Sequence, residues 1–453
     1  MANTYLTRTP SSTGNRRILT ISCWFKRSNI SSTQTLFANG GNSSNRDYIV
    51  FESNQLVVAR YDGGYQYQIK LNRLFRDTSA WTHLVVAFNT TEDSSDNRIK
   101  IYINGVRETS FATNTRPTLN RDTWYNYSGK LQNIGVDYDN AGNDFNGLMS
   151  HVHWCDGAAL APTVFGETDS TTGEWKIKTS PSFTPGTNGF TILKDGNTIT
   201  DQSANSNNFS LGGGTLTKTE DSPSNVFATM NPLAKFRSGA TITEGNNTVA
   251  MTTSKAGVLS TIGIPNNKGK FYVELKMATL ADSSRFHFGL LPFECEVADD
   301  PINTTNLGIM LSGYNAAIYA GGGNINAFYG GTGRFNSFTG ILGMAVDLTS
   351  ATKTIAFSKD GLWITGSNTT NASYSNALKV DITSYLSISS DWHVGVGSGN
   401  SSGTTGVYKM NFGNGYFGTT AVSSAGTNAS GNGIFEYNVP SGYTALSTKG
   451  LNT

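Results

Sequence analysis

Pairs of acids two positions apart are the residues of this sequence that could hydrolyse a glycosidic bond. Such hydrolysis needs two carboxyl groups about 5–10 Å apart, one as the acid and the other as the nucleophile or base. On a strand, residues two apart share a face, as Glu294 with Glu296 and Asp137 with Asp139 would. The chain holds 32 acids, so this spacing must also occur by chance. We therefore favour solvated loops over catalysis at both places and expect no enzyme activity.

An oxygen-rich loop before residue 145 offers possible calcium ligands. The side chains of Asp137, Asp139, Asn143 and Asp144 carry the carboxylate and amide oxygens that Ca²⁺ prefers. Their spacing does not match an EF-hand loop, and a polar turn accounts for the same composition. Calcium and a plain turn are both left open, and we expect no other cofactor.

Clusters of aromatic residues could bind a sugar. Sugar rings have apolar C–H faces and polar hydroxyls, so their recognition needs exposed aromatic rings beside amides and carboxylates. The alternative, which we favour for any single residue, is that the ring fills the core or a subunit contact. The candidate side chains are Trp124, Tyr125 and Tyr127 in the first half of the chain and Tyr314, Tyr319, Phe328 and Tyr329 in the second.

Histidine and cysteine chemistry is weakly indicated. His151 and His153 share a strand face, but the sequence supplies no third metal ligand beside them, so we expect satisfied histidines at the surface or at an interface. Three cysteines are too few and too scattered for a disulfide framework or a zinc site. No Ser-His-Asp grouping, phosphate-binding loop or dinucleotide fingerprint is present.

The charge balance argues against two classes of partner. Charged residues make up 14% of the chain, the formal net charge is +1, and no basic stripe is visible. A protein that neutralises phosphates would show one, so duplex DNA and anionic membrane surfaces are excluded as expected partners. The first ten residues lack the apolar core of a signal peptide, and no apolar run approaches the roughly 20 residues that span a bilayer. We expect synthesis in a bacterial cytoplasm.

The elements that must position these residues are strands. Apolar residues alternate with polar ones at 19–25, 84–88 and 99–103, which is the pattern of strands with one buried face. The third run leads into Asn104-Gly105, a strong signal for a two-residue hairpin because both turn positions need positive φ. Similar runs at 271–276, 344–348 and 407–412 predict strands in the second half. Helical periodicity is nearly absent.

Two domains are expected. The polar, proline-bracketed stretch between 206 and 235 interrupts the alternation, and we place the boundary there. The prediction is an all-β chain of two tandem antiparallel β-sandwiches of the jelly-roll, concanavalin A-like type. They cover residues 1–220 and 236–453 and are joined by a linker at 221–235.

The first half resembles a concanavalin A-like, laminin-G-type sandwich. In that family a Trp-x-His strand precedes a hairpin with Asn-Gly and a final Gly-containing strand, and segments 81–88, 98–106 and 145–153 follow that order. The resemblance implies a lectin-like domain, and the family sometimes holds calcium near the rim of the sandwich. Five further segments resemble a group of phage and environmental-virus structural proteins that carry this domain: 5–17, 156–169, 173–176, 201–209 and 222–232.

The second half resembles a SPRY-type sandwich more loosely. Segment 269–275 is similar to its early strand, 343–348 and 355–361 to its central pair and turn, and 411–413 to its late strand. SPRY domains are interaction modules, so this resemblance implies binding. Segment 440–446 also resembles the endings of such phage proteins.

These features favour a bacteriophage virion structural protein, either a head or tail decoration or a fibre component, that presents lectin-like domains for attachment or host-surface carbohydrate binding. The alternative is a polysaccharide depolymerase of the tail. Expected partners are other virion proteins, a host-surface glycan, and further copies in a symmetric homo-oligomer, with a trimer favoured. Because no coiled coil or repeat shaft precedes the lectin-like domain, we expect that domain to dock on the particle and residues 236–453 to face outward.

Overall fold

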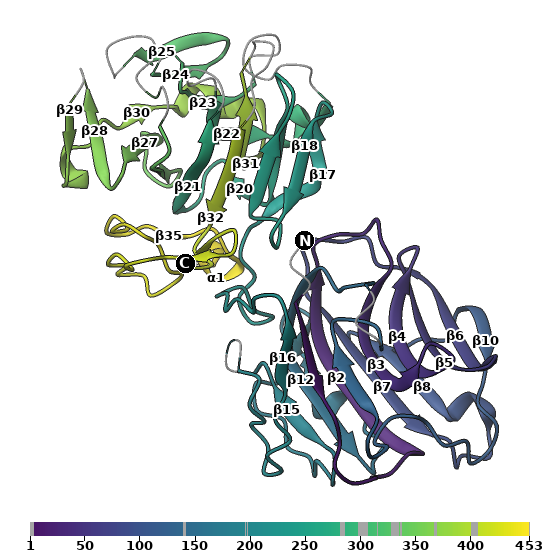
Figure 1. The fold of residues 1–453 in the computed structure, drawn as a ribbon. Coiled ribbons are helices and arrows are strands. Elements are labelled where there is room, and N and C mark those ends of the chain that lie inside the picture. The colour runs from purple at the N-terminus through teal and green to yellow at the C-terminus, as the bar shows by residue number, and fades with distance from the viewer. Residues whose placement is uncertain are drawn as a thin grey trace. The chain divides into compact units, whose positions relative to one another are not determined.

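The computed structural model describes residues 4–138, 142–194, 196, 198–280, 286–297, 307–314, 316–327, 335, 338–366, 369–399 and 406–452. The chain forms two compact units, the first from Met1–Lys218 with Ser222–Ser224 and the second from Thr219–Asp221 with Asn225–Thr453 (Figure 1). Within the described ranges both units are built almost entirely of antiparallel strands, which confirms the predicted all-β fold class. In that same part of the chain, no helix has the length and apolar character needed to cross a membrane.

The first unit is a sandwich of two main sheets, which we call the large and the small sheet. The large sheet runs, in spatial order, β10 (Phe111–Thr115), β6 (Tyr65–Leu74), β5 (Gln55–Asp62), β4 (Asn45–Glu52), β3 (Gln34–Asn42), β11 (Leu131–Ile134), β1 (Tyr5–Arg8) and β16 (Ser210–Gly213). The small sheet runs β15 (Phe190–Ile192), β12 (Gly147–Asp156), β2 (Ile18–Arg27), β7 (Thr82–Asn89), β8 (Ile99–Ile103) and β9 (Val106–Arg107). A separate hairpin joins β13 (Gly166–Thr168) to β14 (Trp175–Ile177).

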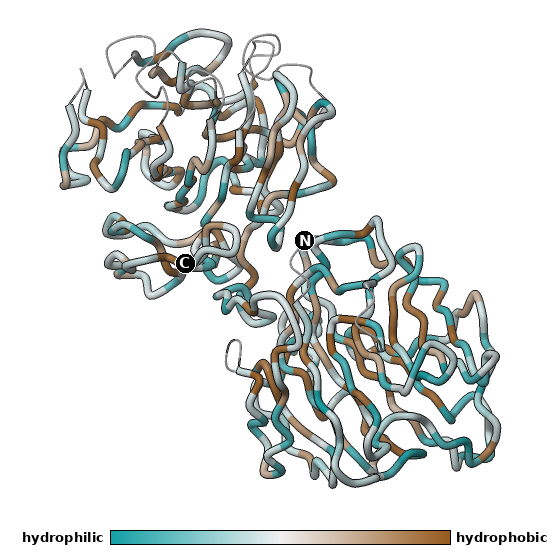
Figure 2. Tube along the Cα trace, viewed as in Figure 1, coloured by the Kyte–Doolittle hydropathy of each residue, from teal (hydrophilic) through white to brown (hydrophobic). Residues whose placement is uncertain are grey.

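Period-two alternation places the core of this unit. In β2, the buried cluster takes Leu19, Ile21, Cys23 and Phe25, the parity expected from the sequence, and β7 and β8 contribute their alternating apolar residues in the same way. Hydrophobic residues accordingly concentrate along the strands (Figure 2). The β8–β9 hairpin turns at Asn104 and Gly105, whose φ values are 47° and 79°. The predicted turn is confirmed.

The second unit also pairs two large sheets. One runs β17 (Met230–Phe236), β20 (Gly257–Pro265), β31 (Asp391–Ser398), β22 (Phe286–Pro292), β23 (Ile309–Ser312), β24 (Ala317–Ala320) and β25 (Gly323–Ala327). The other runs β18 (Ala240–Thr243), β19 (Thr248–Met251), β32 (Gly406–Asn411), β21 (Lys270–Leu280), β26 (Ile341–Asp347), β27 (Thr354–Lys359), β28 (Leu362–Gly366) and β29 (Thr369–Asn371), with β30 (Val380–Asp381) on β27 and β35 (Thr444–Ala445) parallel to β21.

Short elements complete the described chain. They are the pair β33 (Tyr416–Phe417) and β34 (Thr420–Ala421), the 3₁₀ helices η1 (Ser95–Asn97), η2 (Pro162–Val164), η3 (Phe293–Val297), η4 (Tyr374–Asn376) and η5 (Thr383–Ile388), and the single-turn helix α1 (Thr448–Leu451).

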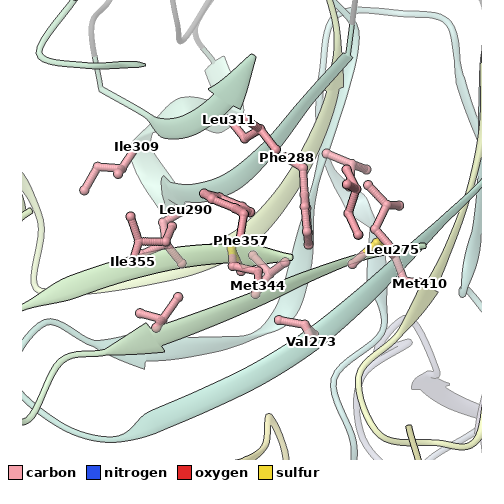
Figure 3. Close-up of a cluster of buried hydrophobic side chains, with 14 of the residues drawn as sticks. Val273, Leu275, Phe288, Leu290, Ile309, Leu311, Met344, Ile355, Phe357 and Met410 are labelled. Carbon is pink, nitrogen blue, oxygen red and sulfur yellow. The ribbon is translucent and has the colours of Figure 1, made fainter. Parts of the chain in front are cut away.

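Facing apolar side chains of the two sheets fill the core of the second unit. Figure 3 shows Phe288 and Leu290 of β22 together with Met344 of β26 and Phe357 of β27. The rings of Phe288 and Phe357 meet edge to face at 6.0 Å, which is a favoured aromatic geometry. Burial of such side chains is the main favourable term in folding of the unit.

The predicted linker at 221–235 is wrong. Met230 begins β17, which pairs with β20, and Phe227, Ala228 and Met230 are buried within the second unit. The change of unit instead falls between residues 218 and 225. The polar composition and prolines of this stretch did not reveal the strand that begins at Met230, nor that Phe227, Ala228 and Met230 are core residues.

A buried carboxylate attaches the C-terminal segment to the second unit. Glu274 of β21 is fully buried and accepts hydrogen bonds from the backbone amides of Glu436 and Tyr437, at 2.9 and 2.8 Å. It also accepts from the Tyr272 hydroxyl and the Asn411 amide, each at 3.2 Å. Phe435 and Tyr443 of the same segment then pack against Tyr272 and its neighbours. One acid therefore satisfies donors from three parts of the chain.

Glu274→Ala will release this segment. The substitution removes the acceptor of two partly buried backbone N–H groups and of the buried Tyr272 hydroxyl, whereas the Asn411 amide keeps the Ile434 carbonyl at 3.0 Å. The loss should lower the free energy of unfolding of the second unit by about 2 kcal/mol. Hydrogen exchange of residues 434–438, followed by mass spectrometry on the full chain, should become faster. Glu294→Ala, at an exposed acid of the same unit, is the control and should leave that exchange unchanged. Equal protection in both variants would contradict the anchoring role.

Candidate functional site

The loop between β10 and β11 turns two of its aromatic residues outward and one inward. Trp124 and Tyr127 are partly exposed, whereas Tyr125 is fully buried in the core. The Tyr125 ring meets Phe88 at 5.5 Å and Trp154 at 5.3 Å, both edge to face. The prediction that Tyr125 could stack on a sugar is therefore wrong, because its ring closes the end of the sandwich.

A buried acid fixes the position of this loop. Asp47 of β4 points into the sandwich and accepts hydrogen bonds from the Tyr67 hydroxyl, at 2.5 Å, and from the backbone amide of Trp124. It also forms an ion pair with Arg60 at 3.6 Å. Burial raises the pKa of Asp47 to about 6, although Arg60 and these donors act in the opposite direction. The backbone at Trp124 is held by a contact that does not depend on its side chain.

Arg16 holds the same loop from the other end. Its carbonyl accepts from the Thr123 amide at 2.8 Å and from the Thr123 hydroxyl at 2.7 Å. Its Nε donates to the Thr123 carbonyl at 2.8 Å. Asn126 then points inward and accepts from the Trp154 indole at 2.9 Å. Thr123 and Asn126 are buried with these partners, whereas Trp124 and Tyr127 keep part of their surface exposed.

Five side chains gather at this end of the first unit, and we call them the rim cluster. The rings of Trp124 and Tyr127 lie 5.6 Å apart and 37° from parallel. The guanidinium of Arg16 lies 4.1 Å from the Tyr127 ring centre, and Arg60 and Lys130 each lie 5.1 Å from that of Trp124. Such cation–π contacts contribute about 0.5–1 kcal/mol at exposed sites.

The rim cluster can bind a polar ligand that has an apolar face. Its rings offer aromatic C–H contact, while Arg16 and Lys130 offer donors to hydroxyl or acid groups. Arg16 is paired with Asp122 at 3.5 Å, but no ion pair of Lys130 is found in the described ranges. The sequence prediction for Trp124 and Tyr127 thus has a geometric basis, and whether they bind a ligand stays a prediction.

The candidate aromatics of the second unit are only partly described. Tyr314 follows β23, and Tyr319 of β24 packs partly buried against Leu291 and Met310. Both rings keep some exposure. Phe328 and Tyr329 lie outside the described residues, so the predicted group cannot be assembled as a whole, and its role stays a prediction.

The proposed calcium loop is also partly described. Asp137 forms an ion pair with Arg46 at 3.7 Å, and Asn143 is exposed, with its carbonyl accepting from the Thr35 amide at 2.7 Å. Burial raises the pKa of Asp144, and Asp139 lies outside the described residues. Within those residues no three His, Cys, Asp or Glu side chains gather as a metal site would require. Calcium stays a prediction here.

His83 contacts a serine, but its ring has the wrong tautomer to act as a general base toward that serine. Its Nε2 lies 2.9 Å from the Ser22 hydroxyl, and its Nδ1 accepts from the Trp175 indole at 3.0 Å. An indole can only donate, so the neutral ring must carry its proton on Nε2 and donate to Ser22. A serine hydrolase needs the reverse, with a carboxylate at Nδ1. His83 instead stacks between Trp24 and Trp175 and attaches β14 to the small sheet.

His151 and His153 also have structural partners. His151 takes a positive φ of 49° at a bulge in β12, and its Nδ1 lies 2.7 Å from the Ser150 hydroxyl. His153 Nδ1 lies 3.0 Å from the Thr191 hydroxyl, and the His153 ring stacks on Phe165. The bulge turns the two rings to 63° from each other. Both histidines have partners, as expected, but the prediction that they lie at the surface or an interface is wrong, because both are buried within the unit.

Aromatic residues that sequence reasoning missed lie on the outer face of the large sheet. Tyr48, Tyr61 and Tyr65 come from three neighbouring strands, β4, β5 and β6. The signal was available in part, because Tyr48 has the opposite parity to the core residues Ile49 and Phe51. Strand register, which joins the three residues, could not be inferred from local alternation.

Comparison with known proteins supports the fold of the first unit. Residues 2–165 match the family model described as the concanavalin A-like lectin/glucanases superfamily, which supports a concanavalin A-like, laminin-G-type domain there. No curated protein matches the chain.

Solved structures resemble parts of the chain at low identity. A SAP-like pentraxin from Limulus polyphemus is 16% identical over 35% of this chain and 72% of its own, with a TM-score of 0.27. Domain 4 of an extracellular arabinanase from Geobacillus stearothermophilus, in complex with arabinotriose, is 18% identical over 34% of this chain and 67% of its own, with a TM-score of 0.27. Domains LG4-5 of the mouse laminin α1 chain are 10% identical over 90% of this chain and 85% of theirs, with a TM-score of 0.29. At these values the likenesses carry no functional argument.

Acid will destabilise the first unit through its buried histidines. Burial lowers the pKa of His83 and of His153 to about 3, from the ordinary histidine value of 6.5. The unfolded chain therefore binds more protons between these two pH values. The contribution of each neutral histidine to the free energy of unfolding is fully present above about pH 6.5. It falls by about 1.4 kcal/mol per pH unit below that pH. Asp47 has the opposite effect on stability: because burial raises its pKa to about 6, its contribution to stability increases as the pH falls below about 6.

The difference between wild type and His83→Gln isolates the histidine effect, since Asp47 is common to both. Glutamine can still accept from Trp175 and donate to Ser22 without titrating. Urea unfolding of the full chain, followed by tryptophan fluorescence, should show the stability advantage of wild type shrinking as pH falls from 7 to 4. A difference independent of pH would contradict the assignment. The signal is dominated by the first unit, which holds Trp24, Trp81, Trp124, Trp154 and Trp175.

Proposed function

We propose that this chain is a non-enzymatic structural protein of a bacteriophage particle that presents lectin-like domains for attachment or host-surface carbohydrate binding. It is made in the cytoplasm of the host bacterium and is part of the head or tail decoration or of a fibre. The observation that carries the binding part of the proposal is the rim cluster. There Trp124 and Tyr127 are partly exposed beside Arg16 and Lys130, on a unit with a concanavalin A-like domain.

The virion part of the proposal is supported by the sequence. Five segments between residues 5 and 232 resemble phage and environmental-virus structural proteins, in the same order. The SPRY-like resemblance of the second half adds a second interaction module. Other virion proteins and further copies of the chain, with a trimer favoured, are the expected partners.

The alternative is a polysaccharide depolymerase. Against it, the buried Asp47 and Glu274 are occupied by donors of the fold, and His83 has the tautomer of a structural residue. A general acid or base has to reach the substrate proton within hydrogen-bond distance. Asp47, Glu274 and His83 are engaged in holding segments of the fold itself.

Trp124→Ala will weaken glycan binding about tenfold or more. The substitution removes the larger ring of the rim cluster but keeps the backbone amide that Asp47 accepts from, so the loop should retain its position. Leu119→Ala, at a residue 46% exposed in the same loop, is the matched control and should bind as wild type. The measurement is a screen of the full chain on arrayed bacterial lipopolysaccharides and capsular polysaccharides, followed by calorimetry on the strongest binder.

The same incubations separate binding from cleavage. We expect no release of reducing ends from any polysaccharide that the chain binds. Release that disappears on substitution of a single carboxylate would favour the depolymerase and overturn the non-enzymatic part of the proposal. Equal binding by wild type and Trp124→Ala would remove the rim cluster as the binding site.

A chain that ends at Ser224 will still be incorporated into particles. The first unit is the part that we expect to dock, and the cut falls before Phe227, which is buried in the second unit. Residues 225–453 expressed alone should not be incorporated. Purified particles from an infection complemented with each fragment can be compared by mass spectrometry. Incorporation of the second fragment alone would reverse the assignment of docking and outward units.

A further inference from the structure

A continuous group of five side chains covers part of the outer face of the large sheet, and we call it the tyrosine ladder. It consists of Tyr138, Arg46, Tyr48, Tyr65 and Tyr61. The Arg46 guanidinium lies 5.2 Å from the Tyr138 ring centre and 5.0 Å from that of Tyr48. The Tyr48 and Tyr65 hydroxyls are 3.4 Å apart, and the rings of Tyr65 and Tyr61 meet edge to face at 5.4 Å.

Strand register assembles the ladder. Arg46 of β4 pairs with Tyr61 of β5, and Tyr61 pairs with Tyr65 of β6, so these three side chains lie in one row across the sheet. Their neighbours Asp47 and Arg60 point to the opposite face. The row lies at the end of the strands next to the turn between β5 and β6.

The apolar residues beside the ladder are already buried. Ala38, Val50, Val57 and Ala59 form a buried cluster with Tyr48 on this face, and Tyr61 packs partly buried against it. The surface that stays open is therefore aromatic and polar rather than aliphatic. A stable protein contact needs a fully buried apolar centre, which this face does not offer.

Tyr65 is the ring open to a ligand. It is 49% exposed, whereas Tyr48 is nearly buried. A Cβ atom added at Gly63 or Gly64, in the adjoining turn, would meet no heavy atom within 4 Å, so the turn next to Tyr65 borders open space. An exposed aromatic ring held by a second ring is a platform for the apolar C–H face of a sugar.

Arg46 and Asp137 add a donor and an acceptor beside the rings. Their ion pair runs from Arg46 Nε to Asp137 Oδ1 at 3.7 Å, which is too long for a hydrogen bond. Arg46 Nη1 donates to the Ser43 carbonyl at 3.3 Å, and Asp137 Oδ1 accepts from the Tyr138 amide at 2.8 Å. In the described part of the chain, Arg46 Nη2 and Asp137 Oδ2 have no hydrogen bond. A donor and an acceptor side by side match two neighbouring hydroxyls of one sugar.

We propose that the tyrosine ladder and Asp137 form a second saccharide-binding site, separate from the rim cluster, for a neutral oligosaccharide. One sugar stacks on Tyr65, and the vicinal hydroxyls of another bond to Arg46 and Asp137. Arg46 and Tyr65 come from β4 and β6, whose backbones are two strand spacings or about 10 Å apart, so the proposed ligand is an oligosaccharide. The inference depends on the carbohydrate-binding part of the proposed function.

Tyr65→Ala tests the site in the full chain. The same array of bacterial polysaccharides, followed by calorimetry on di- and tetrasaccharides of the strongest neutral binder, should show about a tenfold loss of affinity. Arg46→Met should cause a similar loss, whereas Tyr65→Phe, which keeps the ring, should bind within about twofold of wild type. Leu74→Ala, at a residue 44% exposed on the same strand, is the matched control and should bind as wild type. Unchanged thermal unfolding of each variant would show that the fold is intact.

Each contrary outcome is distinguishable. If Trp124→Ala abolishes binding and Tyr65→Ala changes nothing, the second site is refuted while the proposed function stands. If no polysaccharide binds wild type, the carbohydrate-binding function itself fails, and the second site fails with it. If Tyr65→Ala instead reduces self-association or incorporation into particles and leaves glycan binding intact, the ladder is a protein contact and the saccharide assignment is overturned.

Discussion

A strand in a sandwich has to bury every second side chain, and any polar group among the buried ones must find a partner. Strand β4 shows how this requirement positions both the inward and the outward residues of one strand. Its inward residue Asp47 is held by Tyr67, Arg60 and the amide of Trp124, and so it fixes the loop that carries the rim cluster. Its outward residues Arg46 and Tyr48 belong to the tyrosine ladder. One strand thereby positions two exposed aromatic surfaces.

Buried polar groups act as anchors throughout the molecule. Asp47 in the first unit and Glu274 in the second each collect donors from segments far away in the sequence, and His83 joins Ser22 to Trp175. An unpaired buried donor costs about 1–3 kcal/mol, so displacing any of these segments is strongly opposed. The apolar core stabilises each unit, and these contacts select which loop lies where.

The same anchors account for the chemical character of the surfaces. The acids and the histidine that burial perturbs most already have partners within the fold, while the exposed polar groups lie beside aromatic rings. Rings flanked by donors and acceptors recognise a ligand by contact and hydrogen bonding. Both the rim cluster and the tyrosine ladder have that character, although their rings come from a loop in one case and from paired strands in the other.

The sequence by itself determined the all-β architecture, the inward parity of Leu19, Ile21 and Cys23, and the turn at Asn104 and Gly105. Alternation and positive φ are local properties, so the residues that show them are neighbours in the chain. Only the tertiary structure decided that Tyr125 is a core residue while Trp124 and Tyr127 face outward, because a partner such as Asp47 lies 77 positions away along the chain. It also decided that Phe227 and Met230 are core residues rather than parts of a linker, and that Tyr48, Tyr61 and Tyr65 meet. Strand register brings such residues together, and register depends on the packing of the whole sheet rather than on any one segment.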